Sequence, residues 1–130
     1  MQLKASTDYG LRAVLYLAAQ GGTCSSKEIA QGMSIPRDYL IQLAQLLRNA
    51  GIVEARPGKN GGYRLAKDPS QITLLEVIEA LDEDAKGITR IRRDQRANAE
   101  IAPDVRRAYA RALETYVAYF KGTTLAQLFE

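Results

Sequence analysis

The stretch that most constrains how this chain folds is residues 34–50, because its apolar and polar residues alternate at helical spacing. The apolar residues form one stripe: Leu40, Leu43, Ala44 and Leu47. Polar residues form the opposite front of the predicted helix: Arg37, Asp38, Gln42 and Gln45. Pro36 suits the first position of a helix, and Gly51 suits the residue after its end. Such a helix is typical of those that enter the DNA major groove, although an ordinary solvated amphipathic helix shows the same pattern.

The residues before this helix predict a helix-turn-helix. Ser25 followed by Glu28 is a capping box, so we expect a short helix from there to about residue 31. Residues 32–34 then form a tight turn into the central helix, and two helices joined in this way are a helix-turn-helix.

The residues after this helix predict a wing and a further helix. Two strand patterns, at residues 52–56 and 63–66, surround the glycine-rich tip PGKNGG and predict a β-hairpin. Thr73 followed by Glu76 is a second capping box, which opens a strongly apolar helix. The predicted fold class is therefore mainly α, a winged helix-turn-helix with a two-stranded β wing and a long C-terminal dimerisation helix.

That last helix is predicted from Pro103 to about Lys121 by a continuous apolar stripe. The stripe consists of Val105, Ala108, Tyr109, Ala112, Leu113, Tyr116, Val117 and Phe120. A small winged helix cannot cover so long a face, so we expect a homodimer in which two copies of the helix pair. A short turn is expected to follow and to pack Leu125, Leu128 and Phe129. The predicted domains are 1–82 for DNA binding, 83–102 as a linker, and 103–130 for dimerisation and the tail.

Composition and charge limit the function. The chain contains no histidine and a single cysteine, Cys24. Without histidine the commonest general base and metal ligand are both missing, so we expect neither an enzyme nor a metal site. No apolar run reaches the ~20 residues of a membrane helix, and no signal-peptide pattern is present, so we expect a cytoplasmic protein. Residues 1–66 hold eight lysines and arginines against four acids, as a nucleic-acid-binding half would.

We expect the central helix, its neighbours and the wing to contact double-stranded DNA. Arg37 is the candidate for a guanine contact and Gln42 for an adenine contact. Asp38 either accepts from cytosine or caps the helix, and Tyr39 packs with its hydroxyl on a phosphate. The predicted DNA-binding residues are Lys4, Ser26, Lys27, Ser34, Pro36, Arg37, Asp38, Tyr39, Gln42, Arg56, Gly58, Lys59, Asn60 and Gly61.

Four blocks of the chain resemble the Rrf-two (Rrf2) type of winged-helix transcription regulators: QLKASTDYGLRAVLYLA, SIPRDYL…LLRNAGIVEA, GKNGGYRLAKDP and ITLLEVIEAL. The resemblance covers about residues 1–82, and the helix at 103–121 is similar in kind to the family's dimerisation helix. It implies a homodimeric repressor with the central helix in the major groove and the wing at the minor groove. Many members bind a [2Fe–2S] cluster through three cysteines in the loop before the last helix. Here residues 85–103 contain neither cysteine nor histidine, so we predict no cofactor.

Several alternatives remain open from the sequence. Cys24 is either a redox switch, whose pKa the following helix N-terminus lowers, or a small semi-buried residue. An anionic ligand or a partner protein near the arginine-rich residues 90–96 would serve as an effector, or there is no effector at all. The rival to a DNA-binding regulator is a winged helix that serves as a protein-interaction module without an operator.

Overall fold

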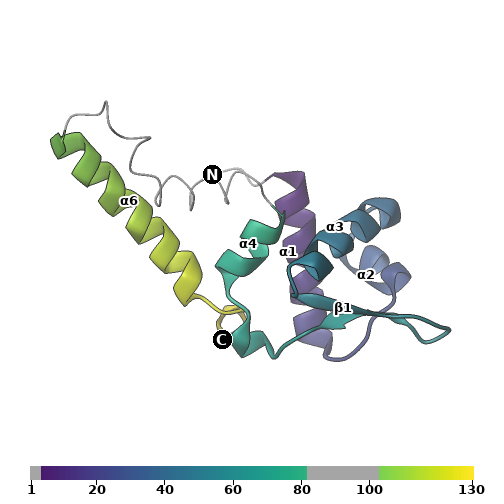
Figure 1. Cartoon of the computed structure of the whole chain (residues 1–130). Helices are drawn as coiled ribbons and strands as arrows, with labels where there is room; N and C mark the ends of the chain where they lie inside the picture. The colour runs from purple at the N-terminus through teal and green to yellow at the C-terminus, as the bar shows by residue number, and fades with distance from the viewer. Residues whose placement is uncertain (1–3, 82–102) are drawn as a thin grey trace.

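The computed structural model describes residues 4–81 and 103–130 of the chain. The elements follow one another as α1 (Ala5–Gln20), α2 (Ser26–Met33), α3 (Arg37–Asn49), β1 (Val53–Arg56), β2 (Gly62–Leu65), η1 (Pro69–Gln71), α4 (Leu74–Leu81), α6 (Pro103–Gly122) and η3 (Ala126–Phe129). Helices α1 to α4 and the hairpin form one body, from which α6 extends as an arm (Figure 1). The predicted mainly helical winged fold with a two-stranded sheet is confirmed. None of the helices in the described ranges is long and apolar enough to cross a membrane.

The helix-turn-helix forms through the local signals that predicted it. The backbone N–H of Glu28 donates to Ser25 Oγ at 3.0 Å, which caps α2. Ser34 takes a left-handed conformation with φ 56°, and the N–H of Ile35 donates to the carbonyl of Ala30 at 2.9 Å. These features reverse the chain between α2 and α3. We expected Pro36 at the first helical position of α3. It lies one residue earlier, at the N-cap, because its ψ of 127° is extended and not helical.

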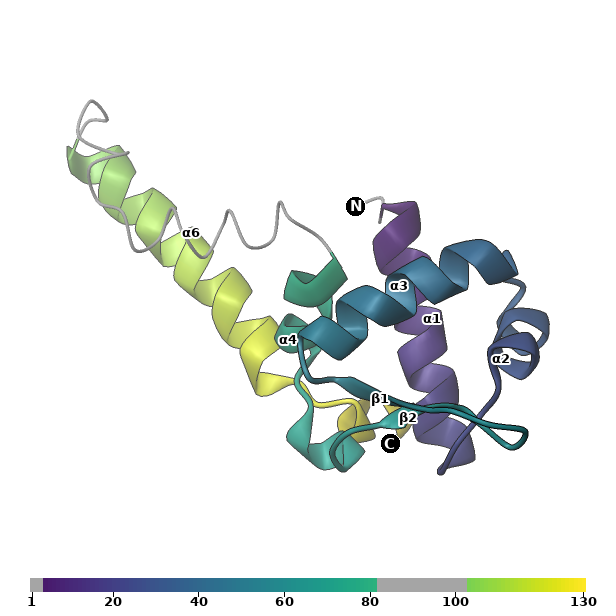
Figure 2. The same cartoon turned by 45° about the vertical axis from the view of Figure 1, so that its right-hand side comes forward.

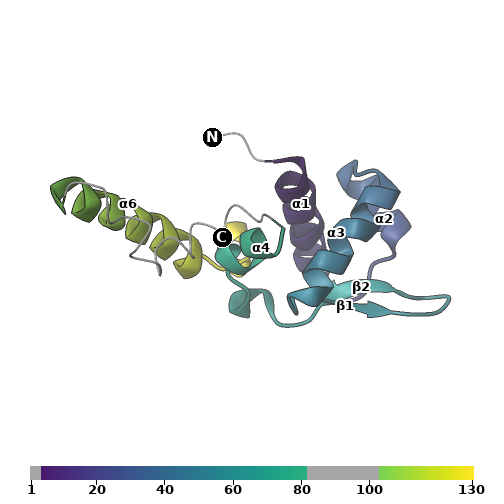
Figure 3. The ribbon, with the colours of Figure 1, turned by 45° about the horizontal axis from the view of Figure 1, so that its top comes forward.

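The wing is an antiparallel hairpin in which Val53 pairs with Leu65 and Arg56 with Gly62. The sequence did not predict how it attaches to the body. Cys24 bridges to Tyr63, with N–H to carbonyl distances of 2.9 and 2.8 Å in the two directions. Cys24, two residues before α2, therefore holds β2 and fixes the wing beside the helix-turn-helix. Figure 3 shows the hairpin beneath α3, with its tip directed away from α6.

The core lies where α1, α2, α3 and α4 meet, and residues from the end of the chain complete it. Its largest fully buried side chains are Val14, Ile29, Leu40, Leu43, Leu47, Ile52, Ile72, Val77 and Leu125. Three of these belong to the apolar stripe of α3, which therefore faces inward as predicted. Burying one such side chain contributes roughly 1.5–3 kcal/mol, so this face fixes which side of α3 remains available to a partner.

The residues after α6 return to the winged body. The N–H of Leu74 donates to the carbonyl of Thr123 at 2.7 Å, and the N–H of Leu125 donates to the carbonyl of Ile72 at 3.0 Å. These bonds turn Leu125 into the core, as predicted. The prediction that Leu128 and Phe129 also pack was wrong for the single chain, because they lie on a surface turn and stay 44% and 54% exposed.

Helix α6 meets the body at its C-terminal end. Phe120 is half-buried and packs against the small cluster of Leu74 and Ile78 on α4. The preceding residue, Tyr119, is 64% exposed, and Val105 near the other end of the helix is 55% exposed. The predicted linker 83–102, with its arginines at 90–96, lies outside the described residues. The side chains of five predicted dimerisation residues also lie outside them: Tyr109, Ala112, Leu113, Tyr116 and Val117.

Candidate nucleic-acid interface

A groove runs between helix α3 and the wing, and Figure 2 shows α3 lying across the body above the hairpin. It has a volume of about 600 Å³. Its lining residues are Ser25, Ser26, Arg37, Arg48, Ala55, Arg56, Pro57, Gly58, Lys59, Gly61, Gly62 and Tyr63. Four of them are cations and none is an acid. Such a groove concentrates positive potential, which favours a polyanion.

The four cations of this groove, Arg37, Arg48, Arg56 and Lys59, are exposed. Within the described ranges none of them forms an ion pair, whereas Arg64 at the base of the hairpin pairs with Glu54 at 2.9 Å. Their charge is therefore available to a partner. We call the groove that these four residues line the cationic groove.

Arg37 is held at the first position of α3. Its Nε donates to Ser26 Oγ, at 3.2 Å, from the first turn of α2. Two predicted site residues are thus brought together, and both line the cationic groove. The guanidinium keeps its other N–H groups for a base or a phosphate, because the contact with Ser26 uses Nε alone.

Arg48 is the one cation of this groove that the sequence did not predict as a contact residue. It lies eleven residues after Arg37, which is three helical turns and therefore the same face of α3. That spacing was the signal that would have found it. Its Nη1 donates to Gln45 Oε1 at 3.4 Å, and Gln45 Nε2 donates to Asn49 Oδ1 at 2.9 Å. This chain of hydrogen bonds orders the polar front at the C-terminal end of α3.

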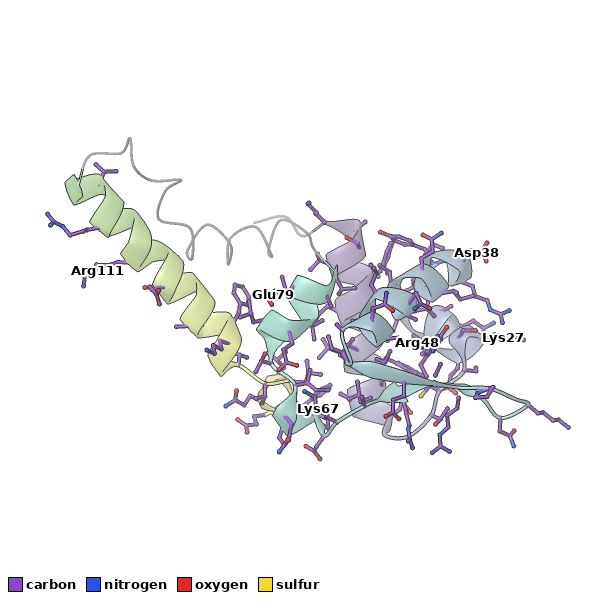
Figure 4. All side chains as sticks on the ribbon, in the orientation of Figure 1. Lys27, Asp38, Arg48, Lys67, Glu79 and Arg111 are labelled. Atoms are coloured by element: carbon purple, nitrogen blue, oxygen red, sulfur yellow. The ribbon has the colours of Figure 1, made fainter. Side chains whose placement is uncertain are left out.

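Most of the other predicted contact residues lie on or beside the elements that form the groove. Lys27 is exposed on α2, beside a shallow depression of about 430 Å³ that Arg37 also lines. Figure 4 shows Lys27, Asp38 and Arg48 on the side of the body that carries α2, α3 and the wing, whereas Arg111 lies on the α6 arm. The remaining predicted residues that are exposed on or beside these elements are Ser34, Pro36, Gln42 and Asn60, whereas Lys4 is exposed on another element. Lys4 lies at the start of α1.

A second network of contacts connects α1 with the turn before α3, on the side of α3 that faces the core. The guanidinium of Arg12 on α1 donates to both carboxylate oxygens of Asp8, at 2.9 and 3.0 Å, and to the carbonyl of Met33 at 3.3 Å. It also lies 5.2 Å from the ring centre of Tyr9, which meets Tyr39 edge to face at 5.6 Å. Tyr39 is therefore a packing residue, as predicted. Arg12 joins α1 to the turn that precedes α3. Sequence spacing alone does not reveal this role.

Replacing Arg12 with methionine is expected to lower the free energy of unfolding by about 1–2 kcal/mol, because the Met33 carbonyl loses a charged donor. The ion pair with Asp8 adds little, since both side chains are about 40% exposed. Chemical denaturation of the two proteins measures the difference. Arg64→Met is the matched control, because it removes an equally short ion pair on the exposed hairpin and should change stability by less than about 0.5 kcal/mol. Equal losses in the two variants would contradict the role given to Arg12.

Cys24 does not have the environment expected of a redox switch. It is buried, with 3% of its surface exposed, and its backbone is engaged in the bridge to Tyr63. Burial, together with the neighbouring Glu28, raises the pKa of the thiol to about 11. Of the two alternatives for Cys24, these observations favour the small buried residue over a redox switch whose pKa the following helix lowers, because burial and a carboxylate outweigh the helix terminus. The thiol is protonated at neutral pH and therefore weakly nucleophilic.

The helix-turn-helix, the wing and the cationic groove between them define a winged helix-turn-helix protein of the nucleic-acid-binding class. Within this class the chain belongs to the Rrf2 family: residues 3–130 match the family, which is described as an iron-dependent transcriptional regulator. The resemblance seen in the sequence is thereby confirmed, and it extends beyond the first 82 residues.

Particular relatives agree with this assignment. The chain is 45% identical over 85 residues to an HTH-type transcriptional regulator of Synechocystis, a match covering 64% of this chain and 58% of that protein. It is similar in structure to CymR, the global cysteine regulator of B. subtilis, with a TM-score of 0.82, 31% identity and coverage of 98% and 95% of the two chains. The IscR of T. potens shares the fold, with a TM-score of 0.77, 24% identity and coverage of 99% and 86%. The relatives are transcriptional regulators, and none of these similarities indicates a catalytic family.

Because the family is described as iron-dependent, the residues of this chain must be compared with those that hold an iron–sulfur cluster. An iron–sulfur cluster is held by several thiolates, with imidazole as the substitute. The chain has one cysteine and no histidine, and that cysteine is buried in the wing attachment. Within residues 4–81 and 103–130 no group of three or more potential ligands gathers. The residues present do not fit a cluster, and no part of the proposed function depends on one.

Proposed function

We propose that this protein is a sequence-specific regulator that binds double-stranded DNA as a homodimer and represses transcription. The observation that carries the proposal is the cationic groove between α3 and the wing, whose four cations form no ion pair within the described part of the chain and whose described lining residues include no acid. In this proposal α3 enters the major groove, and the wing reaches the neighbouring minor groove with Arg56 and Lys59. Lys4 and Lys27 contact phosphates and set the register.

The proposal of a homodimer rests on the C-terminal part of the chain. Val105, Tyr119, Leu128 and Phe129 are large apolar side chains that this single chain leaves 44–64% exposed. Pairing of two α6 arms would remove such surfaces from water and join two DNA-binding units. In this arrangement residues 1–82 bind DNA and residues 103–130 form the dimer contact, while Leu125 ties the second segment into the core of the first.

The experiment that tests the function is selection from random double-stranded DNA, followed by measurement of affinity against salt concentration. A two-fold symmetric site whose affinity falls steeply with salt is expected, because several cations per subunit displace counterions from phosphates. A folded dimer that enriches no sequence would favour a protein-interaction module instead. The same affinity measurement in the presence of thiol reductant and of oxidant tests whether Cys24 is a redox switch. Because the thiol is buried, we expect equal affinity under the two conditions.

Two substitutions are expected to have different signatures on the selected operator. Arg37→Ala should cost about 1–3 kcal/mol and relax the preference at one base position, because a bidentate guanidinium reads a base edge. Lys59→Ala should weaken all sequences to a similar extent and reduce the salt slope by about one per site, because it contacts phosphate alone. Binding of each variant to the operator and to its single-base variants, across salt, measures both. Unchanged specificity in Arg37→Ala would remove the base contact from the proposal.

A further inference from the structure

One side chain on the front of the recognition helix is neither polar nor buried. Ile41 is 44% exposed, although it follows the buried Leu40 directly in the chain. It lies one helical turn after Arg37 and one turn before Gln45, so these three residues share a face of α3. Arg48 continues the same face towards the C-terminal end of the helix. A large aliphatic side chain is thus placed among hydrogen-bonding and charged residues on the front proposed to enter the DNA.

The other large apolar residues with high exposure lie elsewhere. Leu46, 41% exposed, is on the flank of α3 that faces α4, where it lines a separate hollow of about 330 Å³ with Asn49, Glu76 and Glu79. The rest belong to the C-terminal part of the chain: Val105, Tyr119, Leu128 and Phe129. Among the described residues, Ile41 is therefore the exposed large aliphatic that shares the Arg37 face of α3.

The chemistry of the major groove supplies a partner for such a side chain. Three of the four bases present only hydrogen-bonding atoms there, and thymine adds a C5-methyl group. An isoleucine has no hydrogen-bonding atom, so it distinguishes bases only through apolar contact. We infer that Ile41 contacts the C5-methyl of a thymine and is a specificity-determining residue of the operator complex. This inference rests on the proposed function, because it requires α3 to lie in the major groove.

The neighbours of Ile41 make this contact selective. Arg37 lies one turn before Ile41, and Gln45, whose amide also bonds to Arg48 and Asn49, lies one turn after it, so the front of α3 offers polar, apolar and polar groups in sequence. The apolar contact raises the affinity because it removes the thymine methyl group and part of the isoleucine side chain from water. A buried methyl changes affinity about fourfold, and a dimer makes the contact twice, so the whole operator is expected to gain about tenfold to twentyfold.

The test removes the methyl group without changing base pairing. In the selected operator, each symmetric pair of thymines is replaced by deoxyuridine in turn, and the affinity of the parent protein is measured by titration. We expect one pair of positions at which uracil lowers affinity about tenfold to twentyfold. Ile41→Ala should bind the thymine operator correspondingly more weakly and show no further loss with uracil. At the same position, 5-methylcytosine should bind the parent more tightly than cytosine.

Two variants keep the result interpretable. Leu46→Ala removes a side chain of similar size and exposure from the same helix, and it should retain the parent's sensitivity to uracil. Ile41→Val keeps the branched surface and should retain most of that sensitivity. Uracil without effect at every position, or equal sensitivity in Ile41→Ala and parent, would overturn the assignment while leaving DNA binding intact. A parent protein that selects no operator would instead overturn the proposed function, and this inference with it.

Discussion

Replacing Arg48 with glutamate is expected to lower affinity for the selected operator by about a hundredfold at moderate salt. The arginine lines the cationic groove, and within the described ranges it forms no ion pair, so the chain does not offset its charge. The glutamate places a negative charge where phosphates approach, and like charges brought together cost several kcal/mol. In a dimer the change occurs twice. The affinity for unrelated DNA should fall as well, because the contact expected for Arg48 is with DNA phosphates, which every sequence presents.

Arg111→Glu is the matched control for this prediction. It makes the same change of charge at an exposed arginine on the α6 arm, far from the groove (Figure 4). Operator affinity should then change by less than about threefold, because a solvated charge beyond one Debye length is largely screened. Both variants should keep the stability of the parent, since both positions are exposed. If the two variants lost affinity equally, net charge rather than the groove would explain binding.

The sequence predicted those parts of the fold that depend on neighbouring residues. The N-cap bonds of the two predicted capping boxes form, from the N–H of Glu28 to Ser25 Oγ and from the N–H of Glu76 to Thr73 Oγ1, because each needs only residues three apart in one turn. The apolar stripe of α3 is buried for the same local reason. The candidate groove was predicted in part, since Arg37 and the wing cations are recognisable from the pattern of residues. Arg48 was not predicted, because the polar residues that favour a base-reading helix lie near its N-terminal end, whereas Arg48 lies in its last turn.

The parts that could not be predicted join residues far apart in the chain. The bridge between Cys24 and Tyr63 depends on how the wing folds back against the body. The same is true of Leu125, whose place beside Ile72 in the core follows from the path taken after α6. Spacing predicted that Leu125 would pack, and it predicted this equally for Leu128 and Phe129. Only the backbone bonds to residues 72–74 decide which of the three faces inward.

Gly62→Ala is expected to cause a large loss of stability, well above that of Gly58→Ala at the tip of the wing. A Cβ at this position would lie 2.1 Å from the carbonyl oxygen of Cys24, which is backbone and cannot rotate away. Gly62 also has φ 151°, a conformation that residues with a side chain rarely adopt. The strain and the loss of the two bonds between Cys24 and Tyr63 together cost about 3 kcal/mol. Thermal unfolding should show a midpoint lower by about 10 °C.

Gly58→Ala separates the two causes of this loss. Gly58 has φ 103°, yet an added Cβ would meet nothing within 4 Å, so only the backbone conformation is penalised. The expected cost is about 1 kcal/mol. The two variants should also differ in operator affinity. Gly62→Ala detaches β2 from Cys24, and so displaces Arg56 and Lys59 relative to Arg37 and Arg48. Equal midpoints for the two variants would show that the bridge to Cys24 does not hold the wing, and the groove would then need another source of rigidity.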